Sequence, residues 1–102
     1  YPSDIGCYTL ALAQGAIDSI LCMGASVAMA SGFSLADKTK TVVATIGDGT
    51  FFHSGIPPLL NAIYQGHKFV LIILDNSTIA MTGRQTTPER FHQQIDIKKI
   101  VE

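Results

Sequence analysis

The sequence predicts an α/β domain built on a parallel sheet with helices on both faces. Two observations indicate this class. Apolar, partly β-branched runs at 41–46 and 69–74 have the length and composition of strands. An amphipathic stretch long enough for a helix separates them. Strand, helix and strand in this order form a right-handed βαβ unit, whose two strands are parallel.

The composition suits one small domain that faces a partner. Hydrophobic residues make up 47% of the 102 residues and charged residues 15%, which is more core-forming material than a freestanding soluble domain needs. We therefore expect the isolated chain to self-associate. The net charge of −1, without runs of Lys or Arg, argues against nucleic acid or an anionic membrane as a partner.

The two cysteines, Cys7 and Cys22, form no CxxC pair, so the chain has too few ligands for a zinc ion or an iron–sulfur cluster. Reduced thiols in the cytoplasm are the expectation. No apolar run has the length of a membrane span, and no secretory signal is present. Because the chain begins at Tyr1 and not at Met, we expect it to be part of a longer protein.

The first long element is expected to be a buried helix over 17–36, where small and apolar residues recur without proline. Within it, Gly24 and Gly32 suggest close approach of another backbone. The strand at 41–46 follows, then a helix over 54–65 with Ser54 as its N-cap.

The run at 69–74 lacks polar alternation, which predicts a central strand covered on both faces. We expect a polar loop from 76 to 88 and the start of a further helix over 96–102. Asp48 ends the first predicted strand and Asn76 the second, so both lie at the carboxyl edge of the sheet, where open α/β sheets bind ligands.

A carboxylate, an amide oxygen and a nearby backbone carbonyl are ligands that suit Mg²⁺, which takes further ligands from water and phosphate. Gly47 and Gly49 are expected to allow a tight turn after the strand. The free N–H groups of Gly49, Thr50 and Phe51, near a helix start, would face phosphate oxygens. The residues therefore predict a site for a diphosphate and a magnesium ion.

Gly-Asp-Gly at 47–49, then 26 residues, then Asn76, resembles the signature of thiamine diphosphate enzymes. The alternative is a Gly-Asp-Gly turn in another α/β fold with Asn76 as a plain turn residue. Three flanking segments narrow the resemblance to the thiamine diphosphate-binding domain of indolepyruvate:ferredoxin oxidoreductase α subunits, in the 2-oxoacid:ferredoxin oxidoreductase superfamily. The similarity covers about 4–87, and the segments are Asp4–Leu10, Cys22–Ser26 and Asp75–Gln85, together with Gly47–Gly55 around the motif itself.

This resemblance implies that residues 1–102 are part of a C-terminal-type thiamine diphosphate-binding domain, which holds the diphosphate end of the cofactor. It also implies that Asp48, the Asn76 side chain and the Thr78 carbonyl bind Mg²⁺. Thr82 and Gly83 stand where relatives contact the diphosphate.

Cys22-Met23-Gly24 resembles the Thr-Met-Gly segment of related domains, in which a bulky apolar side chain supports the bent cofactor. The alternative for Met23 is plain core packing. Cys7 is expected at a strand end, where it either lines the cofactor pocket or is a small buried residue.

His53 is a candidate proton carrier, although capping of the following helix is the simpler interpretation. Arg84 is a candidate for binding a substrate carboxylate. His67, His92 and the pair Lys98-Lys99 are assigned to solvated surface.

For the whole enzyme, the resemblance implies oxidative decarboxylation of an arylpyruvate such as indolepyruvate to an acyl-coenzyme A, with 4Fe-4S clusters and ferredoxin accepting electrons. The clusters, the second subunit and the pyrimidine-binding domain with its activating Glu would lie outside this chain, which alone would be inactive. The alternatives are a decarboxylase of the phosphonopyruvate or sulfopyruvate type, and a non-catalytic α/β assembly domain.

Overall fold

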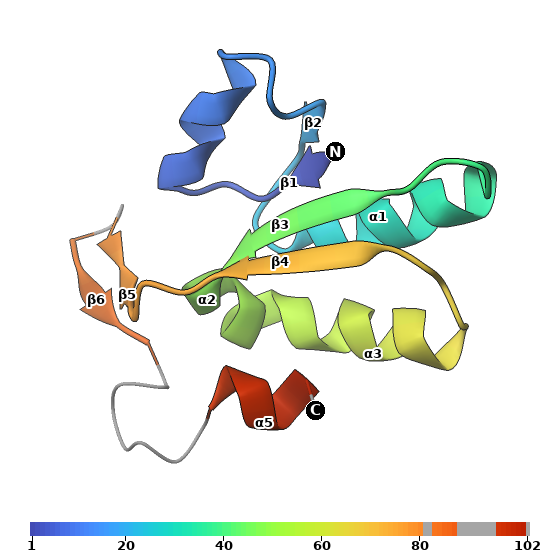
Figure 1. The fold of residues 1–102 in the computed structure, drawn as a ribbon. Helices are drawn as coiled ribbons and strands as arrows, with labels where there is room; N and C mark the ends of the chain where they lie inside the picture. Colours follow the sequence, from blue (N-terminus) through green and yellow to red (C-terminus); the bar gives the residue numbers. More distant parts are fainter. Residues whose placement is uncertain (81–82, 88–95, 102) are drawn as a thin grey trace.

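The fold is a parallel sheet with two helices packed on one face (Figure 1). The computed structural model describes residues 1–80, 83–87 and 96–101. Within these residues, four strands form a parallel sheet in the order β2-β1-β3-β4. The α/β class with a parallel sheet, predicted from the sequence, is confirmed. Helices were expected on both faces, whereas within the described residues α1 (Ala25–Ala36) and α3 (Ile56–Tyr64) share one face.

The N-terminal part contains more sheet and less helix than predicted. Strand β1 (Pro2–Ser3) is followed by the 3-10 helix η1 (Cys7–Leu12), strand β2 (Ser19–Ile20) and helix α1 (Ala25–Ala36). The helix expected over 17–36 is therefore wrong over 17–24, before α1 begins at Ala25. Ser19 and Ile20 pair with β1, and a partner strand overrides local helix propensity.

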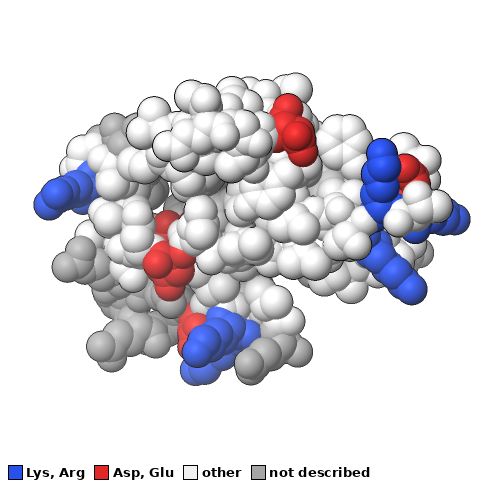
Figure 2. All heavy atoms as spheres, turned by 45° about the horizontal axis from the view of Figure 1, so that its top comes forward, with Lys and Arg blue, Asp and Glu red and all other residues white. Residues whose placement is uncertain are grey.

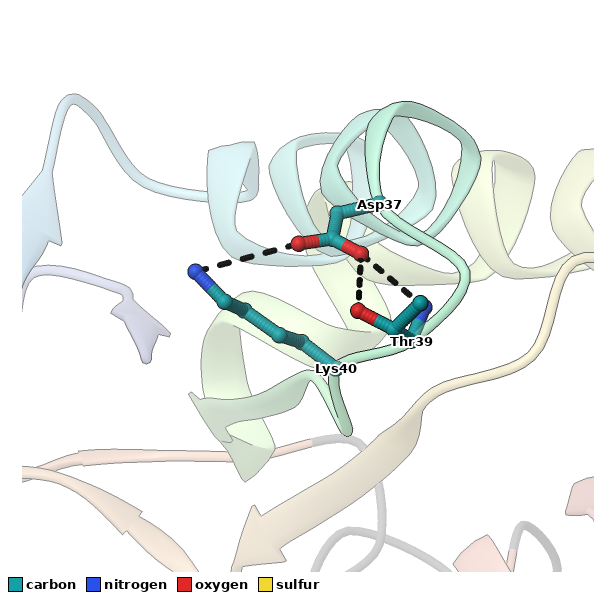
Figure 3. Close-up of polar contacts among 3 residues, drawn as sticks. All are labelled: Asp37, Thr39 and Lys40. Carbon is teal, nitrogen blue, oxygen red and sulfur yellow. Dashed lines mark hydrogen bonds and ion pairs between the residues drawn. The ribbon is translucent and has the colours of Figure 1, made fainter.

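The turn between α1 and β3 is stabilised by polar contacts among Asp37, Thr39 and Lys40 (Figure 3). Asp37 Oδ1 accepts hydrogen bonds from the Thr39 N–H at 2.9 Å and the Thr39 hydroxyl at 2.6 Å. Lys40 Nζ lies 3.7 Å from Asp37 Oδ2. The bonds from Thr39 lower the pKa of Asp37.

Strand β3 (Val43–Gly47) runs directly into a helical stretch that starts earlier than predicted. It consists of α2 (Asp48–Thr50), a π-helical turn η2 (Phe51–Gly55) and α3 (Ile56–Tyr64). Ser54 is therefore inside the helix and not its N-cap, and its hydroxyl lies 3.4 Å from the Thr50 carbonyl.

Pro57 and Pro58 stand at the first turn of α3 and carry no N–H group. The carbonyls of His53 and Ser54 therefore lack the partners that a regular α-helix would supply. The π-turn just before the prolines accommodates this break, as short π segments inside helices often do.

The core lies between the sheet and the helices α1 and α3. Val27 of α1, Ile46 of β3 and Phe51 form one fully buried cluster. Ala30, Val42 and Ala44 form a second buried cluster beside it, and Phe69 and Leu71 pack against both.

Strand β4 (Val70–Leu74) lies at one end of the strand order, not at its centre. Leu71 and Ile73 face the core, whereas Val70, Ile72 and Leu74 on the other face are 48%, 40% and 38% exposed. The prediction that this strand is covered on both faces is wrong for the described chain. An uninterrupted apolar run predicts that both faces of a strand are covered. It does not show whether the covering element belongs to this part of the chain.

The segment after β4 is a hairpin and not simply a loop. Strands β5 (Thr78–Ile79) and β6 (Gln85–Thr86) pair antiparallel, and Gly83 and Arg84 adopt positive φ angles of 108° and 56° in the turn. Helix α5 (Ile97–Val101) confirms the helix expected from residue 96. No helix of the described residues is long and apolar enough to cross a membrane.

The exposed face of β4 predicts how the 102-residue chain associates. On the face of the molecule that Figure 2 shows, charged side chains are few, and a broad uncharged surface lies between them. We expect Ile72→Lys to shift the chain from oligomer toward monomer in sedimentation analysis, because a lysine cannot be buried unpaired in an apolar contact.

The matched control is Leu60→Lys, which places the same charge at a 61% exposed position on α3. Unchanged association of Ile72→Lys, or equal loss in both variants, would show that the contact does not use this face.

Candidate functional site

A cavity of about 450 Å³ opens at the carboxyl edge of the sheet, where β3 and β4 end. In Figure 1 the arrowheads of these strands point toward α2 and the β5–β6 hairpin, which flank this edge. A second hollow of about 710 Å³ lies at the opposite end of the strands and includes Lys38, Lys40 and Lys68. The cavity at the carboxyl edge is lined by Ile5, Gly6, Cys7, Tyr8, Met23, Gly47, Asp48, Gly49, Thr50, Ile73, Leu74, Asp75, Asn76, Thr78, Ile79 and Ala80.

Asp48 is the buried acid of this cavity. It begins the helical stretch after β3 and is only 3% exposed, and its Oδ2 atom has no hydrogen-bond partner among the described residues. Burial raises the pKa of Asp48, and the charge of Asp75 adds to this rise, while the Gly49 and Ser77 N–H groups oppose it. A buried carboxylate oxygen without a partner is costly, so this atom is suited to a bound cation.

The residues after β4 fold back over the cavity through two side-chain-capped turns. Asp75 Oδ1 accepts a hydrogen bond from the Ser77 N–H at 2.9 Å, and Asn76 Oδ1 accepts one from the Thr78 N–H at 3.1 Å. Ser77 has a positive φ of 55°. Asp48, at the start of α2, and Asn76 and Thr78, in the segment after β4, line the same cavity.

The donor set at this edge is small. The described residues hold no group of three or more His, Cys, Asp or Glu side chains that could bind a metal ion by themselves. A metal ion here would need ligands from a backbone carbonyl, water or a phosphate group, which is how Mg²⁺ is usually held.

The glycines at 47 and 49 have a different role from the one predicted. Gly47 has an ordinary extended conformation, with φ −79° and ψ 155°, and Gly49 shows no positive φ. Each is instead needed for space. A Cβ atom on Gly49 would lie 2.5 Å from Cγ1 of Ile79, and one on Gly47 would lie 3.3 Å from the Tyr8 hydroxyl. The side chains of Ile79 and Tyr8 occupy the space that a side chain at position 49 or 47 would need.

The apolar part of the cavity wall includes two further predicted residues. Met23 and Cys7 both line the cavity, and Met23 is 51% exposed, so it is not simply a core residue. Cys7 begins the 3-10 helix η1 and is exposed, rather than ending a strand. Gly24 precedes α1 with a positive φ of 87° and packs against Ser54.

Several predicted residues are not brought to the cavity. His53, Gly83 and Arg84 are exposed and lie outside the lining formed by the described residues. Thr82, like His92, lies outside the residues that the structure describes. His67 is half-buried and hydrogen-bonded to Ser31 of α1, so its assignment to solvated surface is wrong.

Sequence reasoning missed Asp4, a fully buried carboxylate. Its Oδ2 accepts a hydrogen bond from the Gly24 N–H at 2.9 Å, and its Oδ1 accepts one from the Ser26 N–H at 3.0 Å. Asp4 therefore caps the N-terminus of α1 from 20 residues away and anchors the segment that carries Met23. Burial raises the pKa of Asp4, and the bonds to Ser26 and Gly24 oppose this rise.

Loss of this cap should destabilise the domain. We expect Asp4→Ala to lower the free energy of unfolding by about 2–4 kcal/mol, because the buried N–H group of Ser26 and the partly buried one of Gly24 lose their partner. Asp37→Ala is the matched control at the other end of α1, where the carboxylate is half-exposed, and it should cost less than about 1 kcal/mol. Equal costs in urea denaturation would contradict the capping role.

Comparisons with known proteins place the chain in a family. Residues 4–102 match the family model described as thiamine pyrophosphate enzyme, C-terminal TPP binding domain; thiamine pyrophosphate is another name for thiamine diphosphate. The chain is 54% identical over 90 residues to indolepyruvate oxidoreductase subunit IorA of Methanothermobacter marburgensis, covering 86% of this chain and 14% of that protein.

IorA of Archaeoglobus fulgidus is also 54% identical, over 89 residues that cover 85% of this chain and 14% of that protein. A more distant relative, 3D-(3,5/4)-trihydroxycyclohexane-1,2-dione hydrolase of Geobacillus thermodenitrificans, is 41% identical over 58 residues, which cover 55% of this chain and 9% of that protein. The chain thus spans about a seventh of the length of the IorA subunits. By its match over 4–102, it belongs to the C-terminal TPP-binding domain family of thiamine pyrophosphate enzymes.

Proposed function

We propose that the cavity at the carboxyl edge binds the diphosphate of thiamine diphosphate through Mg²⁺. The proposed ligands from the protein are the Asp48 carboxylate, the Asn76 side chain and the Thr78 carbonyl. The observation that carries this proposal is the buried Asp48 Oδ2 atom without a partner among the described residues, because a cation would satisfy it. An all-oxygen set with few protein ligands suits Mg²⁺ bound to a diphosphate.

The rest of the cavity fits the same ligand. Gly47, Gly49 and Thr50 lie at the start of the helical stretch, where backbone N–H groups attract phosphate oxygens. The wall formed by Cys7, Met23 and Ile79 suits the less polar ring portion. From the family resemblance alone, we propose that Thr82, Gly83 and Gly24 also contact or support the cofactor. When bound, thiamine diphosphate supplies the carbanion chemistry needed to cleave the bond beside a 2-oxo group.

For the complete protein, we propose a 2-oxoacid:ferredoxin oxidoreductase that converts an arylpyruvate such as indolepyruvate to an acyl-coenzyme A. The identity to two IorA subunits supports this reaction. In this proposal the chain is one part of a longer cytoplasmic protein. Its pyrimidine-binding domain, activating Glu, 4Fe-4S clusters and second subunit lie elsewhere, and ferredoxin takes the electrons. His53, in η2, and Arg84, beside β6, lie outside the cavity lining of the described residues, and this proposal gives them no role.

The proposal is tested by calorimetric titration of the complete protein with thiamine diphosphate, with Mg²⁺ and with a chelator. We expect binding that requires Mg²⁺. Binding of equal strength in the chelator would contradict the metal-bridged diphosphate. Indolepyruvate consumption that needs both coenzyme A and ferredoxin supports the oxidoreductase, whereas consumption without either favours a simple decarboxylase.

Met23 is expected to affect turnover more than cofactor binding. Met23→Ala in the complete protein should lower turnover at least about tenfold while changing thiamine diphosphate affinity less than about threefold, because the diphosphate contacts remain. Met29→Ala is the matched control, since Met29 lies in α1 outside the cavity lining of the described residues. A parallel fall of turnover and affinity would indicate that Met23 only packs.

A further inference from the structure

Tyr8 occupies a slot that two glycines leave open. It is the second residue of η1, and its ring lies between Gly6 and Gly47. A Cβ atom on Gly6 would lie 2.5 Å from Cε1 of Tyr8, and one on Gly47 would lie 3.3 Å from its hydroxyl. Any side chain at Gly6 would collide with the ring, so the slot is shaped for this tyrosine.

The hydroxyl of Tyr8 is buried and has no hydrogen-bond partner among the described residues. Tyr8 lines the same cavity as Asp48, whose Oδ2 atom is also buried without a partner in that part of the chain. Buried polar groups in native proteins are almost always hydrogen-bonded, to protein, water or a ligand. Among the described residues, three other buried side-chain oxygens without partners, on Ser19, Ser26 and Thr87, belong to residues outside this lining, whereas Tyr8 and Asp48 share it, so a ligand with polar atoms on this side would supply partners for both.

The hydroxyl is available as a donor at neutral pH. Burial raises the pKa of Tyr8 to about 12, and the charges of Asp4, Asp48 and Cys7 add to this rise. The nearby backbone of Gly47 opposes the rise in pKa without reaching hydrogen-bond geometry. The hydroxyl therefore keeps its proton and can donate a hydrogen bond. Because Gly47 directly precedes Asp48, a ligand held by Asp48 would lie on the side of the cavity where Tyr8 packs.

We propose that the Tyr8 hydroxyl is a further binding group of this cavity and donates a hydrogen bond to an oxygen of the bound diphosphate. This inference rests on the proposed function, since it needs a diphosphate near Asp48. It assigns to η1 a direct part in ligand binding, beside the segments that follow β3 and β4. Gly6 and Gly47 then serve to admit the ring that carries this donor.

Tyr8→Phe tests the inference because it removes a single oxygen atom and keeps the ring in its slot. In the complete protein, we expect the affinity for thiamine diphosphate with Mg²⁺ and for inorganic pyrophosphate with Mg²⁺ to fall roughly tenfold in each case. Without ligands, the melting temperature should stay the same or rise, because a buried hydroxyl without a partner no longer has to be desolvated. Tyr64→Phe, at an 86% exposed tyrosine on α3, is the matched control and should change neither quantity.

Three results would overturn the inference. One is unchanged affinity in Tyr8→Phe. Another is a melting temperature that falls together with affinity, which would show that the hydroxyl bonds within the fold. The third is weaker binding of thiamine diphosphate with unchanged binding of pyrophosphate, which would place the acceptor on another part of the cofactor. If Asp48→Ala bound thiamine diphosphate as well as the unsubstituted protein does, the proposed function itself would fail, and this inference with it.

Discussion

Asp48→Ala in the complete protein is expected to weaken Mg²⁺-dependent thiamine diphosphate binding by roughly 100-fold or more. Loss of a group that only orients a metal ligand already costs up to about 100-fold in metal affinity, and loss of the ligand itself should cost at least as much. The diphosphate would then face the sheet edge without the carboxylate that holds its bridging cation. Calorimetric titration with and without Mg²⁺ measures the loss.

The fold should survive this substitution. Asp48 Oδ2 makes no hydrogen bond within the described residues, and of the two N–H groups near the carboxylate, those of Gly49 and Ser77, the second keeps its bond to Asp75. Asp75→Asn is the matched control, because it removes a charge from the same cavity at a residue outside the proposed ligand set. Asn76→Ala should be milder than Asp48→Ala, since water can replace one neutral ligand. Cofactor occupancy at the wild-type level in Asp48→Ala would refute the metal assignment.

Gly24→Ala is expected to destabilise the domain by about 3 kcal/mol. Gly24 has a φ of 87°, a left-handed conformation that costs about 1–2 kcal/mol for a residue with a side chain. A Cβ atom there would also collide with the Ser54 side chain of the π-turn, and such overpacking typically costs a further 1–3 kcal/mol. Because Met23 is the preceding residue, turnover should fall as well.

Gly32→Ala provides a control with the opposite sign. Gly32 lies within α1, the helix that Gly24 precedes, and it is exposed; a methyl group added there would have no neighbouring atom within 4 Å. The substitution should therefore stabilise the domain by roughly 0.5–1 kcal/mol, the difference in helix propensity between alanine and glycine. Urea denaturation of the two variants measures both effects. A neutral Gly24→Ala would show that the contact with Ser54 is absent in solution.

The predictable part of the site came from residues that are close in sequence to a strand end. Asp48 follows the strand predicted at 41–46, and Asn76 follows the next predicted strand. The sequence therefore indicated that both lie at one edge of a parallel sheet, and the structure has both in the lining of one cavity. Parallel pairing explains this success, because strand ends that are parallel neighbours must share an edge. The roles of these residues in binding metal and diphosphate stay predictions.

Other features could not be predicted because they depend on contacts between distant residues. The strand at Ser19–Ile20 exists through pairing with β1, and local composition favoured a helix there. In the sequence, nothing distinguishes Asp4 from other polar residues, whereas in the structure its carboxylate accepts hydrogen bonds from the N–H groups of Gly24 and Ser26. In both cases the deciding hydrogen bonds form only after the chain has folded.

By itself, the sequence determined the α/β class and the edge of the sheet where polar residues gather, because these follow from short-range patterns of apolar and polar residues. The family came from the resemblance of its motifs to known proteins. Only the tertiary structure decided why the glycines at 47 and 49 are needed. Their φ angles are not special, and the space that they leave is filled by Tyr8 and Ile79, which are far away in the chain. Packing between distant segments sets such requirements, and no local pattern records them.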